Sequence, residues 1–326
     1  MPLVPARQPP FDIVRSSFLE LGVSDLDRSR DFYVERLGFV ESDGEGDALY
    51  LRGLEETSHH SLVLRRTREP LALRLGFRVA SEADLEKAQG YFSELGCDVE
   101  RLERPHRGPS LSVRDPLGVP LEFHAGIERV ARKLQRYGEH RGAKPARIDH
   151  FNLFVADVQE AYEQYARLGF RTTEYTETED ADPALWAVWM HRKGNVHDLA
   201  LTSGRGPRLH HVGIWVPSVL DVINTCDVLA TTGHLDALER GPGRHGISNA
   251  FFLYLRDPDG HRVELYTCDY LTVDPDFEPI GWKLSDPQRQ TLWGAPAPRS
   301  WFEEGSHFEG TEVKEPRLPA KPIVAV

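Results

Sequence analysis

The sequence predicts an α+β protein in which four βαβββ modules pair into two barrel-like domains, followed by a C-terminal tail. Three observations predict this fold class. A strand, a polar cap, a helix and a glycine recur in that order four times, alternating apolar and polar stretches follow the helices, and Asp-Pro-x-Gly closes the second and fourth repeats. A chain of 326 residues is long enough for about two domains of ordinary size. Its 40% hydrophobic and 28% charged residues are typical of a soluble globular protein.

Each repeat begins with a short apolar strand and continues into an amphipathic helix, which a small polar residue caps and a glycine ends. The four repeats start at Phe18, Leu73, His150 and His210, and their helices end at Gly38, Gly96, Gly169 and Gly233. Half-buried strands are expected where apolar and polar residues alternate after the helices. Clear examples are 48–52, 61–65, 199–201 and 251–255.

Two turns of the same type indicate an internal duplication. They are Asp115-Pro-Leu-Gly118 and Asp257-Pro-Asp-Gly260. We therefore expect an N-terminal domain over residues 11–128 and a C-terminal domain over residues 146–270, joined by a charged, helix-like linker. Residues 271–326 are rich in Pro and Trp without a clear period, so this tail needs a surface to pack on, and a functional site is one such surface.

The charge and the apolar runs of the chain exclude several classes of protein. Lys and Arg number 39 against 51 Asp and Glu, a net charge of −12, and no basic block is present, so nucleic acid is not expected as a partner. The N-terminal residues lack the apolar core of a signal peptide, and no run approaches the roughly 18 apolar residues of a membrane span. We therefore expect a cytoplasmic protein. Cys97, Cys226 and Cys268 are too widely spaced for a disulfide framework or a thiolate zinc site.

Aligning the two halves on their shared marks shows where they differ. The aligned pairs are His150 with Phe18, His211 with Arg74, and Glu264 with Glu122. Two imidazoles and one carboxylate from separate strands can hold one face of an octahedral Fe(II) or Mn(II), and they leave the opposite positions open for substrate and dioxygen. A metal site is therefore predicted in the C-terminal half. None is expected in the N-terminal half, because Glu122 alone cannot hold a transition metal.

Several motifs resemble those of a known family. They are Asp149-His-Phe-Asn152, Trp189-Met-His-Arg-Lys193, Gly206-Pro-Arg-Leu-His-His211, Glu239-Arg-Gly-Pro-Gly-Arg-His-Gly246 and residues 257–266. With these motifs the chain resembles the type I extradiol catechol dioxygenases of the vicinal oxygen chelate superfamily over nearly its whole length. The resemblance implies the paired barrel-like domains of that superfamily, a homotetramer, and Fe(II), or Mn(II) as in some relatives, bound by His150, His211 and Glu264. It identifies His211 and not its neighbour His210 as the ligand.

The resemblance further implies that two residues take part in the chemistry. His197 matches an acid–base histidine, which the reaction needs because the catechol loses protons and the bound oxygen gains one. Its counterpart in the first half, His60, has no metal candidate beside it, so an architectural role for His197 stays open. Tyr254 matches a phenol that hydrogen-bonds the substrate, and its position before the Asp-Pro-Asp-Gly turn lets it face Glu264 across a hairpin.

Four further residues match the substrate pocket of the family. Asn152 and Trp189 match residues near the oxygen and the ring, although an Asn beside a strand and a Trp among small apolar residues also fit purely structural roles. Arg240 and His245 match residues that meet a carboxylate on the side chain of the substrate. The donor fork of a guanidinium suits that task.

One position departs from the pattern of the family. A second carboxylate-binding arginine is expected where this chain has Gln290, and Arg289 lies one position earlier. Three explanations stay open: Arg289 takes its place after a one-residue shift, a single arginine suffices, or the substrate carries a different side chain.

The resulting hypothesis is an extradiol ring-cleaving dioxygenase. It uses Fe(II) and O2 to open a catechol, with 3,4-dihydroxyphenylacetate as the first candidate, to a muconic semialdehyde. Another substituted catechol, a metal-dependent isomerase or lyase of the glyoxalase type, and a protein that only sequesters ligands stay open as alternatives. The His-His-Glu set favours the oxygenase over a ligand-sequestering protein.

Overall fold

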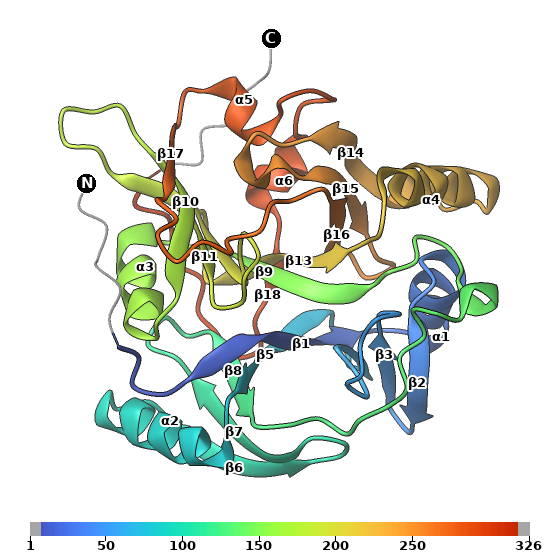
Figure 1. Cartoon of the computed structure of the whole chain (residues 1–326), viewed down its shortest axis with the longest axis horizontal. Coiled ribbons are helices and arrows are strands. Elements are labelled where there is room, and N and C mark those ends of the chain that lie inside the picture. Colours follow the sequence, from blue (N-terminus) through green and yellow to red (C-terminus); the bar gives the residue numbers. More distant parts are fainter. Residues whose placement is uncertain (1–7, 319–326) are drawn as a thin grey trace.

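Two mixed β-sheets, one from each half of the chain, form the computed structural model, which describes residues 8–318 (Figure 1). The first sheet lies below the second in Figure 1, and β1 (Ile13–Val23) and β9 (Arg147–Val155) run next to each other at the centre. No helix within residues 8–318 is long and apolar enough to cross a membrane.

The first sheet has eight strands. Besides β1 they are β2 (Val40–Glu45), β3 (Ala48–Arg52), β4 (Leu62–Arg66), β5 (Leu71–Val79), β6 (Val99–Arg104), β7 (Gly108–Arg114) and β8 (Pro120–His124). Their order is β2-β3-β4-β1-β5-β8-β7-β6. In this order β1 lies parallel to β4 and antiparallel to β5, so one strand joins two modules.

The second sheet has ten strands. Besides β9 they are β10 (Arg171–Glu177), β11 (Leu185–His191), β12 (Leu199–Ser203), β13 (Arg208–Trp215), β14 (Leu238–Arg244), β15 (Phe251–Arg256), β16 (Arg262–Thr267), β17 (Ile280–Lys283) and β18 (Ser306–His307). Their order is β14-β15-β16-β13-β9-β12-β11-β10-β17, with β18 paired to β13. Here β9 takes the place of β1, because it lies parallel to β12 and antiparallel to β13.

Each module has one helix, and each helix begins after a capping residue of the predicted type. The four helices are α1 (Leu26–Arg30), which continues as the π-type turn η1 (Asp31–Arg36), α2 (Glu82–Glu94), α3 (Val158–Arg167) and α4 (Val219–Thr231). The side chains that accept backbone N–H groups of the first turns are Asp25, Ser81, Asp157 and Ser218. The predicted α+β fold of four βαβββ modules is therefore confirmed.

The short helices lie in the connections and the tail. They are η2 (Tyr137–Glu139), η3 (Leu235–Ala237), η4 (Ile247–Asn249), α5 (Pro287–Gln290) and α6 (Arg299–Glu303). The predicted helix-like linker is wrong, because η2 is the one helical turn between β8 and β9. Gly142 has a φ of +54°, where a Cβ would lie 2.3 Å from the Arg36 carbonyl oxygen, and Pro145 lacks an N–H, so neither position suits a regular helix.

The duplication predicted by the repeats is visible in the packing of two glycines. A Cβ at Gly213 would lie 2.0 Å from the His150 ring, and a Cβ at Gly76 would lie 2.0 Å from the Phe18 ring. Each glycine is paired with the aromatic residue on the neighbouring strand. His150 and Phe18 therefore take equivalent places in the two halves, as the sequence alignment of the repeats requires.

Each Asp-Pro-x-Gly turn contacts the helix of the opposite half. Asp115, after β7, accepts hydrogen bonds from Gln164 Nε2 at 2.7 Å and Tyr165 Oη at 3.0 Å on α3. Asp257, after β15, accepts one from Tyr33 Oη at 2.9 Å on η1. All these side chains are buried. The two halves are thus joined by a reciprocal pair of carboxylate contacts.

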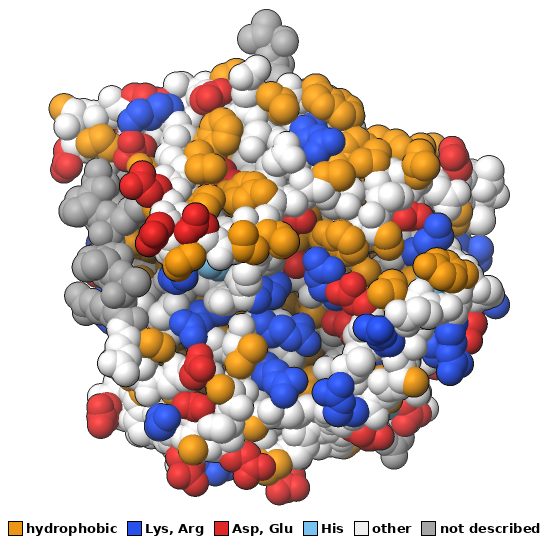
Figure 2. Space-filling model, in the orientation of Figure 1, with side chains coloured by type: hydrophobic (Ala, Val, Ile, Leu, Met, Phe, Trp, Pro, Cys, Tyr) orange, Lys and Arg blue, Asp and Glu red, His pale blue; other side chains and the backbone are white. Residues whose placement is uncertain are grey.

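The surface charge is unevenly distributed. On the face drawn in Figure 2, Lys and Arg side chains gather across the middle of the molecule, and apolar side chains gather above them. The formal net charge of −12 therefore does not describe this face, and anions are not repelled from every side.

We predict that Asp115→Asn changes the pH dependence of stability. Burial raises the pKa of Asp115 to about 6, although backbone and side-chain hydrogen bonds oppose the rise. Because this folded-state pKa lies above that of the unfolded chain, the stabilisation is complete below about pH 4 and is lost as the pH rises through about 6. Asparagine does not ionise, so the free energy of unfolding of the variant relative to the parent should rise by up to about 3 kcal/mol from pH 4 to pH 7. Urea unfolding at both pH values measures this difference, and an equal difference at the two would contradict the prediction.

Candidate metal centre

The predicted ligands His150, His211 and Glu264 come together in the interior of the second sheet. His150 on β9 and Glu264 on β16 both pair with Gly213 of the strand between them, β13, and His211 lies two residues before Gly213 on the same face. Glu264 Oε2 lies 3.1 Å from His150 Nε2 and 3.1 Å from His211 Nε2, and the two Nε2 atoms are 3.3 Å apart. The three side chains are buried.

These separations fit one divalent transition metal. Donors at right angles on a metal with bonds of roughly 2.2 Å lie about 3.1 Å apart, as in the facial arrangement of an octahedral ion. The two imidazole planes cross at 82°, so their in-plane lone pairs can converge. The residues present therefore suit the predicted metal.

The charges of the site also favour a cation. Hydrogen bonds to Asp149 and Glu264 raise the pKa of His150 to about 9 against the opposing effect of burial. The pKa of Glu264 lies well below its usual range because three histidines contact it, although burial acts the other way. Without metal, a proton on His150 is thus favoured and supplies the positive charge beside Glu264. A bound dication would supply that charge in its place.

The neighbour His210 prepares His211 to bind metal. His210 Nε2 donates to the Trp301 carbonyl at 2.7 Å, so its Nδ1 is an acceptor, 2.5 Å from His211 Nδ1. His211 then carries its proton on Nδ1 and presents an unprotonated Nε2 to Glu264 and His150. His210 itself does not line the pocket, as predicted, although a bulge at His210 interrupts the alternation of strand side chains on which that prediction was based.

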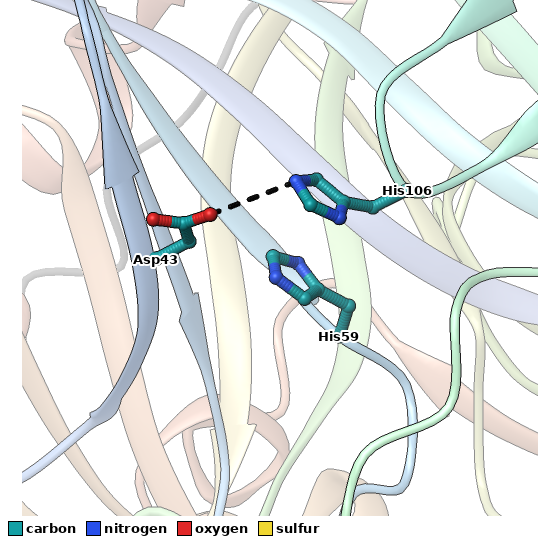
Figure 3. A group of neighbouring side chains, drawn as sticks. All are labelled: Asp43, His59 and His106. Carbon is teal, nitrogen blue, oxygen red and sulfur yellow. Dashed lines mark ion pairs between the residues drawn. The ribbon is translucent and has the colours of Figure 1, made fainter.

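A second group, Asp43, His59 and His106, lies in the N-terminal half (Figure 3). Its two imidazoles are stacked with centroids 3.8 Å apart and planes only 4° apart, so their in-plane lone pairs lie in two separate, nearly parallel planes and do not meet at one point. His106 Nδ1 already donates to Glu128 at 2.7 Å, and His59 Nδ1 lies 3.1 Å from His60 Nδ1. As it stands, this group does not form a three-sided ligand set like that of the C-terminal half.

The first half has guanidinium groups where the second half has metal ligands. Glu122, equivalent to Glu264, lies 3.0 Å from Arg74 Nη1 and 3.2 Å from Arg107 Nε. The Arg107 guanidinium also lies 4.0 Å from the centre of the Phe18 ring. Arginine side chains therefore supply the positive charge beside this buried carboxylate.

A pocket opens beside the metal ligands, and six of the other predicted site residues line it. They are Asn152, Trp189, His197, His245, Tyr254 and Arg289. The sequence analysis did not assign eight further residues of the wall, which are Trp186, Thr202, Ile247, Ser248, Ala250, Tyr266, Gln290 and Trp301. Tyr266 was within reach, because it follows Glu264 by two positions on the same strand, but nothing in the sequence distinguishes most of the others from core residues.

His197 lies directly against a metal ligand. Its ring centre is 3.9 Å from that of His150, and its Nδ1 is buried without a hydrogen-bond partner among the described residues. Burial and the nearby His150 hold the pKa of His197 well below its usual value, so the imidazole is neutral. An unpartnered, neutral imidazole at the wall is free to exchange a proton with a bound molecule.

Tyr254 and His245 form a chain along another side of the pocket. Tyr254 pairs directly with Glu264 across the β15–β16 hairpin, as predicted. His245 Nδ1 donates to the Gln290 carbonyl, so its Nε2 accepts the hydrogen bond from Tyr254 Oη, 3.1 Å away. Burial and the nearby Glu264 raise the pKa of Tyr254 well above its usual range, which keeps the phenol protonated as a donor.

Two buried arginines lack part of their hydrogen bonding. Arg240 lies behind the pocket wall, between the rings of Phe252 and Trp301, each 4.8 Å from its guanidinium. Its Nη2 donates to the Gln290 carbonyl at 3.1 Å, whereas Nε and Nη1 have no hydrogen-bond partner among the residues that the structure describes. Arg289 Nη2 on the wall has none either. Within residues 8–318 neither guanidinium forms an ion pair, and burial lowers both pKa values to about 10.

We expect one equivalent of divalent metal per chain, bound at the triad. Glu264→Gln removes the charged ligand, so metal affinity should fall at least about tenfold and the rise in melting temperature on metal addition should disappear. His59→Ala, in the stacked group, should keep the full equivalent. Elemental analysis and thermal unfolding measure both effects, and loss of the metal from the His59 variant would contradict the assignment.

Comparison with known proteins agrees with this geometry. A family model described as Glyoxalase/Bleomycin resistance protein/Dioxygenase superfamily matches residues 15–123 and 147–265. A solved structure of homoprotocatechuate 2,3-dioxygenase from Brevibacterium fuscum, in complex with 3,4-dihydroxyphenylacetate, is 43% identical, with a TM-score of 0.90 over 96% of this chain and 99% of that one. The homoprotocatechuate 2,3-dioxygenase of Arthrobacter globiformis is 42% identical, with a TM-score of 0.90 over 96% of this chain and 99% of that one.

One curated relative is named for a different catechol substrate. It is the manganese-dependent 2,3-dihydroxybiphenyl 1,2-dioxygenase of Geobacillus genomosp. 3, which is 30% identical over 87% of this chain and 95% of that protein. The chain therefore belongs to the glyoxalase/bleomycin resistance protein/dioxygenase superfamily, and within it to the type I extradiol catechol dioxygenases, with likeness to the homoprotocatechuate 2,3-dioxygenases.

Proposed function

We propose that this extradiol dioxygenase acts on 3,4-dihydroxyphenylacetate and opens its ring with O2 to a muconic semialdehyde. The observation that carries the substrate is the presence of two buried, incompletely hydrogen-bonded guanidinium groups, that of Arg289 on the pocket wall and that of Arg240 behind it. A buried charge without a partner is costly, so an anionic group on the substrate would be favoured there. The complex of the Brevibacterium fuscum enzyme with 3,4-dihydroxyphenylacetate supports the same choice.

The metal in this proposal is Fe(II), with Mn(II) as the alternative. An imidazole and carboxylate donor set binds Fe(II) more tightly than Mn(II) in the usual order of divalent ions. His150, His211 and Glu264 would hold the ion, which would supply open coordination for the substrate and make the otherwise spin-forbidden reaction with dioxygen accessible. The reaction breaks one ring C–C bond and the O–O bond, and both oxygen atoms enter the product.

His197 is the proposed acid–base residue. The His197 ring lines the pocket next to His150, so the neutral imidazole can accept a proton when the catechol is ionised and return it to oxygen as the O–O bond breaks. The architectural alternative is less suitable, because an imidazole kept only for packing would leave a buried nitrogen unsatisfied.

The other wall residues orient the substrate in this proposal. When the substrate binds, the O–H of Tyr254 turns from His245 Nε2 to a catechol oxygen, and Asn152 and Trp189 border the oxygen and the ring. Arg289 takes the place of the expected second arginine, since it reaches the wall from the position before Gln290. The Gln290 carbonyl binds both Arg240 and His245, so the carboxylate subsite is assembled partly by the tail.

The central experiment reconstitutes metal-free protein anaerobically with Fe(II) or Mn(II), adds a diol, and then admits air. With 3,4-dihydroxyphenylacetate we expect a yellow product and one O2 consumed per substrate, faster with Fe(II). Plain catechol and protocatechuate are the comparison substrates. If no diol gives colour or oxygen uptake with either metal, the proposed function is wrong.

The carboxylate subsite is tested by Arg289→Met in the same assay. Loss of a hydrogen bond to a charged group should raise KM for 3,4-dihydroxyphenylacetate about 10- to 100-fold, and should leave KM for 4-methylcatechol within about twofold. Arg244→Met is the matched control, because Arg244 lies on β14 and does not line the pocket. Equal effects on both substrates, or an equal effect of the control, would speak against a carboxylate contact.

His197→Asn tests the acid–base role. We expect kcat to fall about 10²- to 10⁴-fold, while anaerobic binding of the catechol changes by less than about threefold. His191→Asn is the control, because His191 is a buried histidine of the preceding strand that does not line the pocket. A kcat within about threefold of the parent enzyme would contradict the acid–base role and favour an architectural one.

A further inference from the structure

Asp149 contacts the metal ligand that follows it in the chain. Its Oδ2 lies 3.2 Å from His150 Nδ1, the nitrogen that faces away from Glu264, and also accepts a hydrogen bond from Asn195 Nδ2 at 2.8 Å. A metal-binding imidazole commonly donates its second N–H to a carboxylate, which fixes the orientation of the ring. Asp149 is completely buried, so no water competes for this contact.

A β-bulge makes this contact between adjacent residues possible. On β9, His150 pairs with Gly213 and Ile148 pairs with Ile214, so Asp149 is an extra residue without its own partner on β13. Side chains of adjacent strand residues normally point to opposite faces, and a bulge removes that restriction. The same irregularity occurs at Ser17 in β1, before Phe18, but Ser17 contacts His124 within its own half, at 2.8 Å.

Lys193 and Asp198 hold Asp149 from the segment that carries His197. Lys193 Nζ donates to the Asp149 carbonyl and lies 2.8 Å from Asp198 Oδ1 and 4.0 Å from Asp149 Oδ1. Asp198 Oδ2 accepts the backbone N–H groups of Arg192 and Lys193 at 2.7 and 3.0 Å. Asp198 therefore braces the turn between β11 and β12 from within, and Lys193 connects this turn to Asp149 on β9.

The first half of the molecule completes this network through Ser16 of β1. The Ser16 N–H donates to Asp198 Oδ1 at 2.8 Å, and its hydroxyl donates to the Asp149 carbonyl at 2.7 Å. Ser16, Asp149 and Asp198 are all fully buried. A strand of the opposite sheet thus reaches two of the anchors around His150.

We propose that Asp149 is a positioning residue for His150 and that Ser16, with Lys193 and Asp198, holds Asp149 in place. Through Ser16, the N-terminal half then helps to position a metal ligand of the C-terminal half. In the N-terminal half itself, arginines occupy the place of the metal site. The inference rests on the His-His-Glu triad and not on the identity of the substrate.

The test is a Mn²⁺ titration of chelator-treated full-length protein, followed by electron paramagnetic resonance. Asp149→Asn keeps the size of the side chain and removes its charge, so we expect Mn²⁺ affinity to fall about 10- to 100-fold and the spectrum of bound Mn²⁺ to change. Ser16→Ala should lower the affinity about three- to fivefold. Both readouts are independent of turnover, so failure of the proposed substrate would leave them unchanged.

Ser17→Ala is the matched control. It removes a buried hydroxyl from the adjacent position of the same strand, so it should lower the melting temperature about as much as Ser16→Ala and leave Mn²⁺ affinity and the spectrum unaltered. Equal Mn²⁺ affinities of the Ser16 and Ser17 variants, or parental affinity in Asp149→Asn, would overturn the proposal. If Asp149→Asn does not fold, the comparison of the two serine variants decides alone.

Discussion

A buried carboxylate facing two imidazoles needs a positive charge, and the arrangement of the second sheet follows from that need. Three neighbouring strands bring Glu264, His150 and His211 within about 3 Å of one another in an interior that excludes water. The middle strand passes beneath the His150 ring only because Gly213 has no side chain. A bound divalent ion would supply that positive charge, and the pocket lies beside the three ligands.

The duplicated half shows another solution to the same charge problem. Glu122 keeps the place of Glu264, but arginines surround it and a phenylalanine replaces the first histidine. A guanidinium is a permanent cation with a fixed direction, so it stabilises the carboxylate without offering an open coordination position. The half without a catalytic ligand set is therefore not an unused copy, since it retains a charged core and supplies contacts to its partner.

Much of the fold and the triad could be predicted from the sequence because the repeats supply an internal alignment. The difference between His150 and Phe18 points to a metal ligand only if both residues occupy the same strand position in their repeats. The Asp-Pro-x-Gly turns that close the repeats provide this alignment. The contacts of Asp149 and His210 with the histidines that follow them could not be predicted, because the period of two places adjacent residues on opposite faces and a bulge cancels that rule. The tail was expected to need a surface such as a functional site, and Arg289 was expected there, but the place of Trp301 in the wall could not be predicted, since a segment without periodicity does not reveal which of its residues face the site.

The reciprocal contacts between turns and helices have a consequence for synthesis on the ribosome. Asp115 meets its tyrosine 50 residues later in the chain, but Tyr33 waits for Asp257, 224 residues downstream. The first half of the chain therefore leaves the ribosome before Asp257, the buried partner of Tyr33, has been made. The helical segment that carries Tyr33 can reach its final packing only when most of the second half has been translated. Assembly of the early half is thereby coupled to completion of the late one.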